Sequence, residues 1–243
     1  MERHIERLTY VEVKKLIEEG KDTVVLPIGT IEAHGPHLPL ATDVLIPVSL
    51  AERIADTLDA LIAPPISYGI TRSLLAYSGS LTVSSQVFKE YVKGILESLA
   101  RHGFKKVIVV NGHGGHLNEL KEVGMEIWSG FRLKTVMFHW WLALGEFTKE
   151  FFGEQSGHAA IDETAMIMAI DENLVKEELY SEQAVATNMQ GVDVYPFHGS
   201  VILYKKGEGF PVFDASKATE YYEGVVKNTI ELLKEILDKW NSI

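Results

Sequence analysis

The sequence contains no cysteine among its 243 residues. Disulfide bonds and thiolate metal ligands are therefore excluded, and any metal site has to use imidazole and carboxylate groups. No segment approaches the roughly 18 consecutive apolar residues of a membrane-spanning helix, so we expect no membrane partner. The first ten residues, MERHIERLTY, also lack the apolar run of a secretory signal, which favours a cytoplasmic protein.

Positive charge is scarce as well. The chain has 23 Lys and Arg against 34 Asp and Glu, which gives a formal net charge of -11 at pH 7. This balance repels a phosphate backbone and no basic stripe offsets it, so we expect no nucleic-acid partner. The 46% hydrophobic content is ordinary for a globular protein with a sizeable core. Because no repeat or linker is visible, we predict a single domain over residues 1–243.

Apolar, β-branched segments alternate with helical patterns along the chain. Strands are predicted within residues 22–30, 60–66, 105–115 and 133–141, and helices within 46–59, 84–103, 116–128, 165–170 and 216–240. The strand segments are continuously apolar, which is typical of parallel strands buried on both faces. The predicted fold is therefore α/β, a three-layer α/β/α sandwich with a mostly parallel central sheet.

Three polar, histidine-containing loops follow or precede these elements, at residues 31–47, 111–116 and 156–164. Ligands of such folds bind in loops beyond the carboxyl ends of the strands. We therefore expect the three loops to converge on one pocket, and this convergence carries the functional argument.

The first loop has the spacing of a metal site. If the chain stays extended past residue 30, Glu32 and His34 point to the same side, and the glycine and prolines that follow let Asp43 return to them. His113 arrives from a neighbouring strand end, followed by Gly114 and Gly115, which let the backbone pass close to a ligand. Carboxylate and imidazole ligands suit Zn, Mn or Fe. With one more carboxylate, two metals sharing a bridging Asp become feasible.

Other interpretations stand beside this one. A single histidine in a loop is more often a structural residue than a metal ligand. The clustering of Glu32, His34, Asp43 and His113 nevertheless favours metal binding. His37 either contacts substrate or braces the Pro-rich loop, and His102 precedes a helix-ending glycine, where a cation favours the helix dipole. The segment NGHGG is also compatible with a phosphate cradle. It does not match G-x-G-x-x-G because residue 117 is Leu, which disfavours a dinucleotide fold.

The segments GTIEAHGPHLPLATD, NGHGG and GHAAIDETA resemble, in order, the three motifs of the creatininase (creatinine amidohydrolase) family. The resemblance runs from about residue 23 to residue 170. It implies a layered α/β fold, a two-metal centre, a homo-oligomer (a hexamer by family resemblance) and cleavage of non-peptide C–N bonds of amides. Carried over by position, Glu32 and His113 bind one metal, His34 binds the other, and Asp43 bridges them.

The chain also departs from creatininase proper. That enzyme has a metal-binding Glu where this chain has Gly115, and a Glu before the third-motif histidine where this chain has Gly157. Glu163 is our candidate to supply the missing ligand. Trp141 falls where creatininase has a tryptophan that covers the substrate. The alternative interpretation is that Trp141 closes the edge of the hydrophobic core beside Trp140. Creatinine is therefore not the expected substrate.

The leading hypothesis is a metal-dependent amidohydrolase acting on a small cyclic amide or formamide, with a metal-activated water as nucleophile. His158 is the expected general acid, with Glu163 also assigned to the catalytic set; alternatively, His158 only orders the start of a helix. Deformylation of a formylaminopyrimidine ribonucleotide, a non-catalytic binding module, and removal of a terminal residue from a peptide cofactor precursor are the alternatives.

Overall fold

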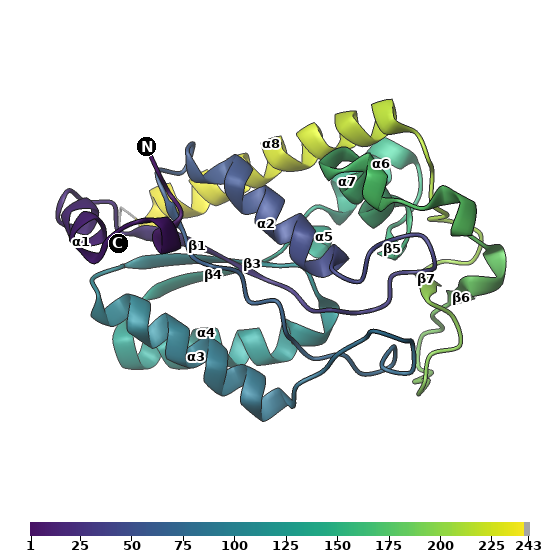
Figure 1. Cartoon of the computed structure of the whole chain (residues 1–243), viewed down its shortest axis with the longest axis horizontal. Coiled ribbons are helices and arrows are strands. Elements are labelled where there is room, and N and C mark those ends of the chain that lie inside the picture. The colour runs from purple at the N-terminus through teal and green to yellow at the C-terminus, as the bar shows by residue number, and fades with distance from the viewer. Residues whose placement is uncertain (241–243) are drawn as a thin grey trace.

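Four parallel strands form the central sheet of the computed structural model, which describes residues 1–240 (Figure 1). The strand order is β2 (Leu61–Ile62), β1 (Thr23–Ile28), β3 (Lys106–Asn111), β4 (Lys134–His139). The register places Ile28 beside Asn111, and Asn111 beside His139. The carboxyl ends of β1, β3 and β4 are therefore level, and the loops that leave them begin side by side.

Helices cover both faces of this sheet, which confirms the predicted three-layer α/β/α sandwich (Figure 1). On one face lie α3 (Ser85–Arg101) and α4 (Leu117–Phe131), and on the other lie α2 (Thr42–Ala55), α7 (Ile161–Ile170) and α8 (Ala215–Trp240). Successive strand residues point to opposite faces. Val24 thus packs in the core under α3 and α4, whereas Val25 packs in the core under α2 and α8.

Several boundaries differ from the sequence-based expectation. Helix α4 extends to Phe131 instead of ending at residue 128, and α7 begins at Ile161 instead of residue 165. The helix expected from residue 46 begins at Thr42, which places Asp43 in its first turn instead of in a loop. The strand expected over 60–66 is reduced to Leu61–Ile62. The two prolines that follow it have no N–H to give to a ladder, which explains the short strand.

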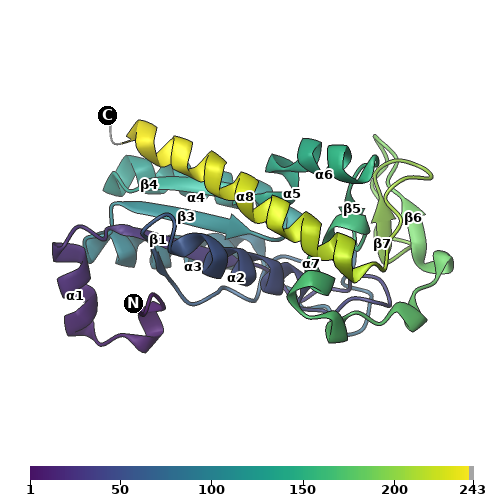
Figure 2. The ribbon, with the colours of Figure 1, turned by 90° about the horizontal axis from the view of Figure 1, so that it is seen from above.

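A second, three-stranded sheet lies beyond the carboxyl ends of the first and was not predicted (Figure 2). In it β7 (Val201–Leu203) pairs antiparallel with β5 (Gly157–His158) and parallel with β6 (Val185–Thr187). These strands are only two or three residues long, so no periodicity marks them in the sequence. The sheet holds His158 at a fixed position beside the ends of the central strands.

The remaining elements are short. They are η1 (Ile5–Arg7), α1 (Tyr10–Glu18), η2 (Gly114–His116), α5 (Trp140–Ala143), α6 (Gly145–Phe152), η3 (Glu172–Leu174), η4 (Glu177–Leu179) and η5 (Glu182–Ala184). Within residues 1–240, no helix combines the length and the apolar character needed to cross a membrane.

Candidate metal centre

Two glycines allow the first turn of α2 to rest against the strand ends. A Cβ added at Gly29, just after β1, or at Gly112, just after β3, would lie 2.1 Å from the Asp43 carbonyl oxygen. No side chain fits in that space. The same carbonyl lies four residues before Pro47, which has no N–H to bond it within the helix. Because Gly29 and Gly112 have no side chains, the first turn of α2 approaches the carboxyl ends of β1 and β3 closely, and Asp43 lies against them.

Asp43 lies between two imidazoles. Its Oδ1 is 2.9 Å from His34 Nε2 and its Oδ2 is 2.8 Å from His113 Nδ1. The side chain is only 2% exposed. The structure thus brings together residues 34, 43 and 113 as the sequence predicted, with one carboxylate oxygen facing each ring.

The first group of potential ligands consists of Glu32, Asp43 and His113. Glu32 Oε1 lies 3.7 Å from His113 Nδ1. The opposite ring nitrogen, Nε2, lies 2.8 Å from the Ile70 carbonyl, to which it donates a hydrogen bond. A neutral imidazole with its proton on Nε2 directs the Nδ1 lone pair at the two carboxylates. Such an orientation is that of a metal ligand.

The second group consists of His34, His158 and Glu163. His34 Nδ1 donates to the Glu32 carbonyl at 2.9 Å, so the Nε2 lone pair faces Asp43 and, at 3.7 Å, Glu163 Oε2. His158 Nε2 donates to the Ala33 carbonyl at 2.9 Å, and its Nδ1 lies 4.0 Å from Glu32 Oε1. The rings of His34 and His158 are 4.2 Å apart. Each histidine therefore directs into the site the ring nitrogen that is not bonded to a backbone carbonyl.

Charge accumulates in this buried space. Burial raises the pKa of Glu163 to about 8, and Asp43 and Asp162 add to that rise. Burial opposes a charge on His34 and His113, but neighbouring carboxylates raise their pKa values to about 10 and about 9. Without a metal, protons thus occupy the space between acceptor atoms that face one another. Divalent cations fit the same donor set, because they replace these protons on carboxylate and imidazole ligands.

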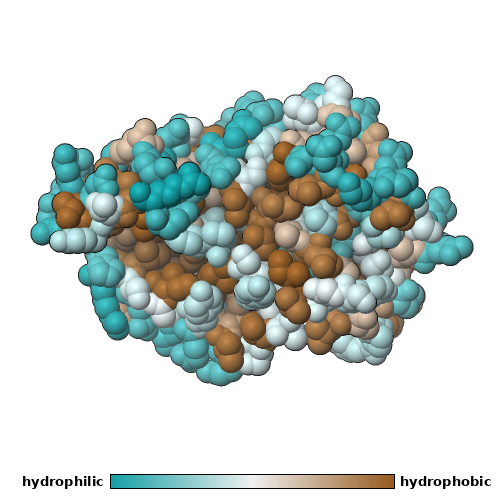
Figure 3. Space-filling model, viewed as in Figure 1, coloured by the Kyte–Doolittle hydropathy of each residue, from teal (hydrophilic) through white to brown (hydrophobic). Residues whose placement is uncertain are grey.

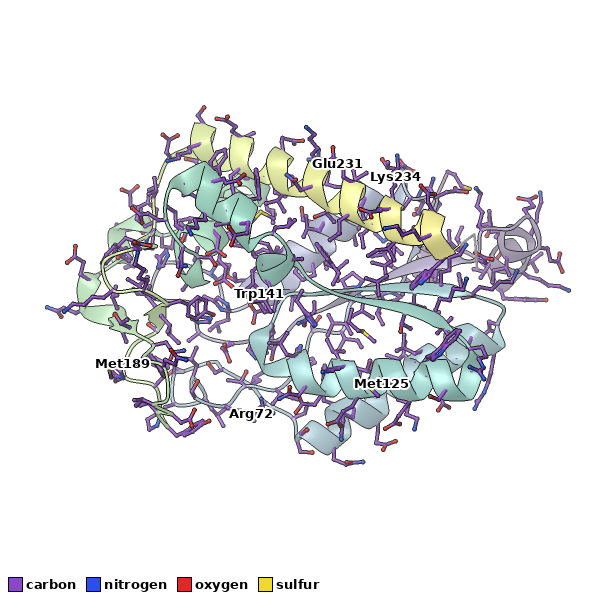
Figure 4. The ribbon with its side chains drawn as sticks, turned by 180° about the vertical axis from the view of Figure 1, so that it is seen from behind. Arg72, Met125, Trp141, Met189, Glu231 and Lys234 are labelled. Carbon is purple, nitrogen blue, oxygen red and sulfur yellow. The ribbon has the colours of Figure 1, made fainter. Side chains whose placement is uncertain are left out.

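Five of the six residues of the two groups line a cavity of about 330 Å³; His34 lies buried behind this lining. Gly114, Gly115 and Trp141 line it as predicted, and Trp141 comes from α5 directly after β4 (Figure 4). His37 is instead buried away from this lining, with its Nε2 3.0 Å from Thr164 Oγ1 and its ring against Tyr180. These contacts favour the bracing interpretation of His37 over a contact with substrate.

A family model described as creatinine amidohydrolase, Creatininase, matches residues 6–233. The chain belongs to the creatininase family. Members of this family are metal-dependent amidohydrolases.

The chain is also similar to three curated proteins. The creatinine amidohydrolase of Pseudomonas putida is 26% identical over 216 residues, covering 78% of this chain and 79% of that protein. The 3-dehydro-scyllo-inosose hydrolase of Thermotoga maritima is 27% identical over 112 residues, 46% of this chain and 36% of that protein. The mycofactocin precursor peptide peptidase of Mycolicibacterium smegmatis is 31% identical over 107 residues, 40% of this chain and 41% of that protein.

Crystal structures agree on the fold. One of creatinine amidohydrolase gives a TM-score of 0.83 at 21% identity and covers 96% of this chain and 97% of its own. A mutant creatininase described as the Zn-Zn type gives 0.80 at 21% identity, and one described as creatininase Mn gives 0.76 at 20% identity. Each of these two covers 97% of this chain and 98% of its own.

The departures from creatininase proper have a steric basis. A Cβ at Gly115 would lie 2.5 Å from both His113 Nε2 and the Ile70 carbonyl oxygen, and a Cβ at Gly157 would lie 2.5 Å from the Ile202 carbonyl oxygen. Glutamate therefore does not fit at either position of this backbone. Glu163 reaches the second group from the first turn of α7, where the Ala159 N–H donates to its Oε2 at 2.6 Å.

Some residues of the site were not found from the sequence. Asn111 binds both the backbone N–H and the carbonyl of His113, and accepts a hydrogen bond from His116 Nδ1. His116 Nε2 in turn accepts the Ile70 N–H. This network ties the second motif to the loop before α3. Both side chains belong to the polar loop at residues 111–116, so the signal was present, whereas Arg72 of the pocket lining lies outside every motif.

Proposed function

We propose that this protein hydrolyses a C–N bond of a small amide or formamide at two divalent metal ions, Zn, Mn or Fe. Glu32, Asp43 and His113 would hold one ion, and His34, Asp43 and Glu163 the other. This proposal rests on the position of Asp43 between the two ligand groups. One of its carboxylate oxygens faces the imidazole of His34 and the other faces that of His113. When bound, such a pair of ions activates water and polarises a carbonyl. The Zn-Zn and Mn creatininase structures support the choice of metals.

His158 is the proposed proton carrier. Its Nε2–H is held by the Ala33 carbonyl, which leaves Nδ1 as the nitrogen on the pocket side. Nδ1 accepts a proton from the attacking water and then donates it, as general acid, to the departing nitrogen. Gly157 and Ala159 flank the ring with almost no bulk and leave room for substrate. Trp141, Gly114 and Gly115 form the wall against which the amide lies.

The test is metal content measured together with turnover. Asp43→Asn should lose most of the two equivalents of metal and all measurable hydrolysis across an amide and formamide panel, because one carboxylate serves both ions. Asp193→Asn, an exposed residue of the same lining, is the control and should keep both ions. Full metal content in Asp43→Asn would show that the metal site lies elsewhere.

The same panel separates the candidate substrates. A formylaminopyrimidine ribonucleotide is the first alternative to a cyclic amide, since a formamide presents the same carbonyl. The similarity to mycofactocin precursor peptide peptidase supports a peptide substrate as the next candidate. Metal loading without hydrolysis of any member would indicate a non-catalytic binding module.

We also propose that the chain forms a homo-oligomer, a hexamer by analogy with the family. Figure 3 shows apolar side chains gathered between α2 and α3 on one face. A hollow of about 580 Å³ there is lined by residues such as Ile5, Ala63 and Ile66, beside the exposed Tyr91. Exposed apolar surface of this kind commonly marks a protein interface. Light scattering that finds only a 27.1 kDa particle would contradict this proposal.

A further inference from the structure

Arg72 is the one Lys or Arg among the described residues that line the pocket. It lies in the loop between β2 and α3, below Trp141 in the view of Figure 4. Its Nη1 donates to the Gly115 carbonyl at 3.0 Å and its Nη2 donates to Glu119 Oε1 at 2.8 Å. Gly115 adjoins the metal centre, so the guanidinium is attached to the rim of the site.

The guanidinium is held in place from behind. Glu119 is 6% exposed, and its Oε1 also accepts the Ser85 hydroxyl at 2.7 Å. The Arg72 side chain itself is 48% exposed. Two of its five N–H donors are used in these contacts, and the rest of the planar fork is free for a ligand. An arginine oriented in this way has lost much of its side-chain freedom before any ligand arrives.

Arg72 is not the counter-ion of the metal centre. Within residues 1–240 its ion pair is with Glu119, and none of the three carboxylates of the two metal groups lies within 4.0 Å of it. Two divalent ions would more than balance those three carboxylates, so the loaded pocket favours negative charge. The remaining acidic residue of the lining, Asp193, is exposed to solvent, where water screens its charge.

We propose that the substrate carries an anionic group, a carboxylate or a phosphate, at a distance from the scissile amide, and that Arg72 binds this group. The inference rests on the proposed amide hydrolysis at the metal centre. The cavity of about 330 Å³ is larger than a formamide group needs, so a second functional group has room inside it. A guanidinium fork matches the oxygens of carboxylate and phosphate in a two-point contact. Arg72 thereby selects anionic over neutral amides.

The test uses hydroxamic acids, which chelate divalent metals, with a variable alkyl chain that ends in a carboxylate, a phosphonate or a neutral primary amide. Dissociation constants are measured by calorimetry on the metal-loaded protein. In the wild type the best anionic member should bind roughly ten- to a hundredfold more tightly than its neutral partner, as expected for hydrogen bonds to a charged group. Comparison of the carboxylate and phosphonate series identifies which anion the site prefers.

Arg72→Gln should abolish this preference and leave the affinity for the neutral members unchanged. A purely structural role of Arg72 would instead weaken both series equally. Arg72→Lys keeps the positive charge but not the planar fork, so it should retain an intermediate preference for the anionic members. This variant also keeps the proposal testable if Arg72→Gln does not fold. Lys121→Gln, on α4 outside the pocket lining, is the control and should behave as wild type.

The outcomes separate the two proposals. A wild type that binds neutral hydroxamates without any anionic preference overturns the role of Arg72 and leaves the metal centre intact. A preference that persists in Arg72→Gln overturns it as well. Failure of every hydroxamate to bind the wild type overturns the metal centre itself.

Discussion

The two nitrogens of His158 differ in function at the scale of single residues. Nε2 is committed to the Ala33 carbonyl, and Nδ1 faces the pocket. We predict that His158→Gln reduces turnover by roughly 10²–10⁴-fold, the range for a positioned proton donor, while both metal ions remain bound. Steady-state kinetics and elemental analysis of the same preparation check this.

A competing role for His158 is visible in the geometry, because it shares a potential ligand group with His34 and Glu163. If His158 is a ligand and not a proton carrier, His158→Gln will lose about one equivalent of metal together with the rate. Loss of metal in that variant would therefore reassign the residue, and full activity would leave the proton carrier unidentified.

Glu163 and Asp162 form a matched pair of neighbouring buried carboxylates with different surroundings. Glu163 belongs to a ligand group, whereas Asp162 Oδ1 accepts the Gly157 N–H at 3.4 Å and its Oδ2 has no hydrogen-bond partner within residues 1–240. We predict that Glu163→Gln lowers the metal content by about one equivalent and the rate with it, and that Asp162→Asn keeps both ions. Elemental analysis of the two variants decides this. An unchanged metal load in Glu163→Gln would make the residue only a helix cap.

The contact between α2 and the strand ends controls the site at the scale of elements. A Cβ at Gly112 would lie 2.1 Å from the Asp43 carbonyl oxygen and 2.7 Å from Pro47 Cγ. We predict that Gly112→Ala displaces α2 from the strand ends and lowers the free energy of unfolding by at least about 1–3 kcal/mol. The displacement should also reduce the metal content. Chemical denaturation and elemental analysis measure the two effects.

Gly94 provides the control for this change. It lies inside α3, and a Cβ added there would have no atom of the described residues within 4 Å beyond its own helix backbone and chain neighbours. Gly94→Ala should keep both ions and raise the free energy of unfolding by up to about 1 kcal/mol, because alanine is the better helix former. Equal behaviour of the two alanine variants would refute the steric role of Gly112.

The sequence predicted the elements that have a strong local pattern. β1 and β3 each contain an uninterrupted apolar run, and α3 has both an N-cap serine, Ser84, and a terminating glycine, Gly103. The strands of the second sheet are too short for any period to appear, and their pairing joins residues far apart in the sequence, such as Gly157 with Leu203 and Val185 with Val201. Local pattern carries no information on such contacts.

The candidate site shows the same division. The structure brings Glu32, Asp43 and His113 of the motif loops together, since the level strand ends of a parallel sheet bring their loops together, whereas His37 lies outside the pocket lining. Arg72 was missed because its loop carries no motif, and because its position at the pocket depends on long-range contacts with the Gly115 carbonyl and Glu119. The steric exclusion of glutamate at Gly115 likewise depends on the distance to a different loop, at Ile70.

The metal centre links the stability of the whole molecule to pH. In the metal-free protein, neighbouring carboxylates raise the pKa of His34 to about 10 and that of His113 to about 9, and burial raises the pKa of Glu163 to about 8. Each folded pKa lies above the unfolded value, so the folded state binds more protons between about pH 7 and pH 9. The contribution of these groups is complete below their unfolded pKa values and is lost as pH rises through the folded ones.

Two other histidines, His158 and His37, affect the stability only outside the range from about pH 7 to pH 9. Burial lowers the pKa of His158 to about 3 and that of His37 to about 4, so their contribution is already complete above the unfolded value of about 6.5. Above pH 7 the groups with raised pKa values therefore set the trend.

We predict that the melting temperature of chelator-stripped protein decreases as the pH is raised from about 7 to about 9. The metal-loaded protein should not show this decrease, because its buried groups carry metal instead of protons. Bound divalent ions take the place of the protons on His34, His113 and Glu163, and their affinity increases as competing protons become scarce. The stabilisation by metal should therefore widen with rising pH, which calorimetric melts of both forms will measure. Metal-free Glu163→Gln, with one titrating group removed, should show a shallower fall than the metal-free wild type. Parallel curves for the loaded and stripped proteins would mean that the metals bind away from these buried groups.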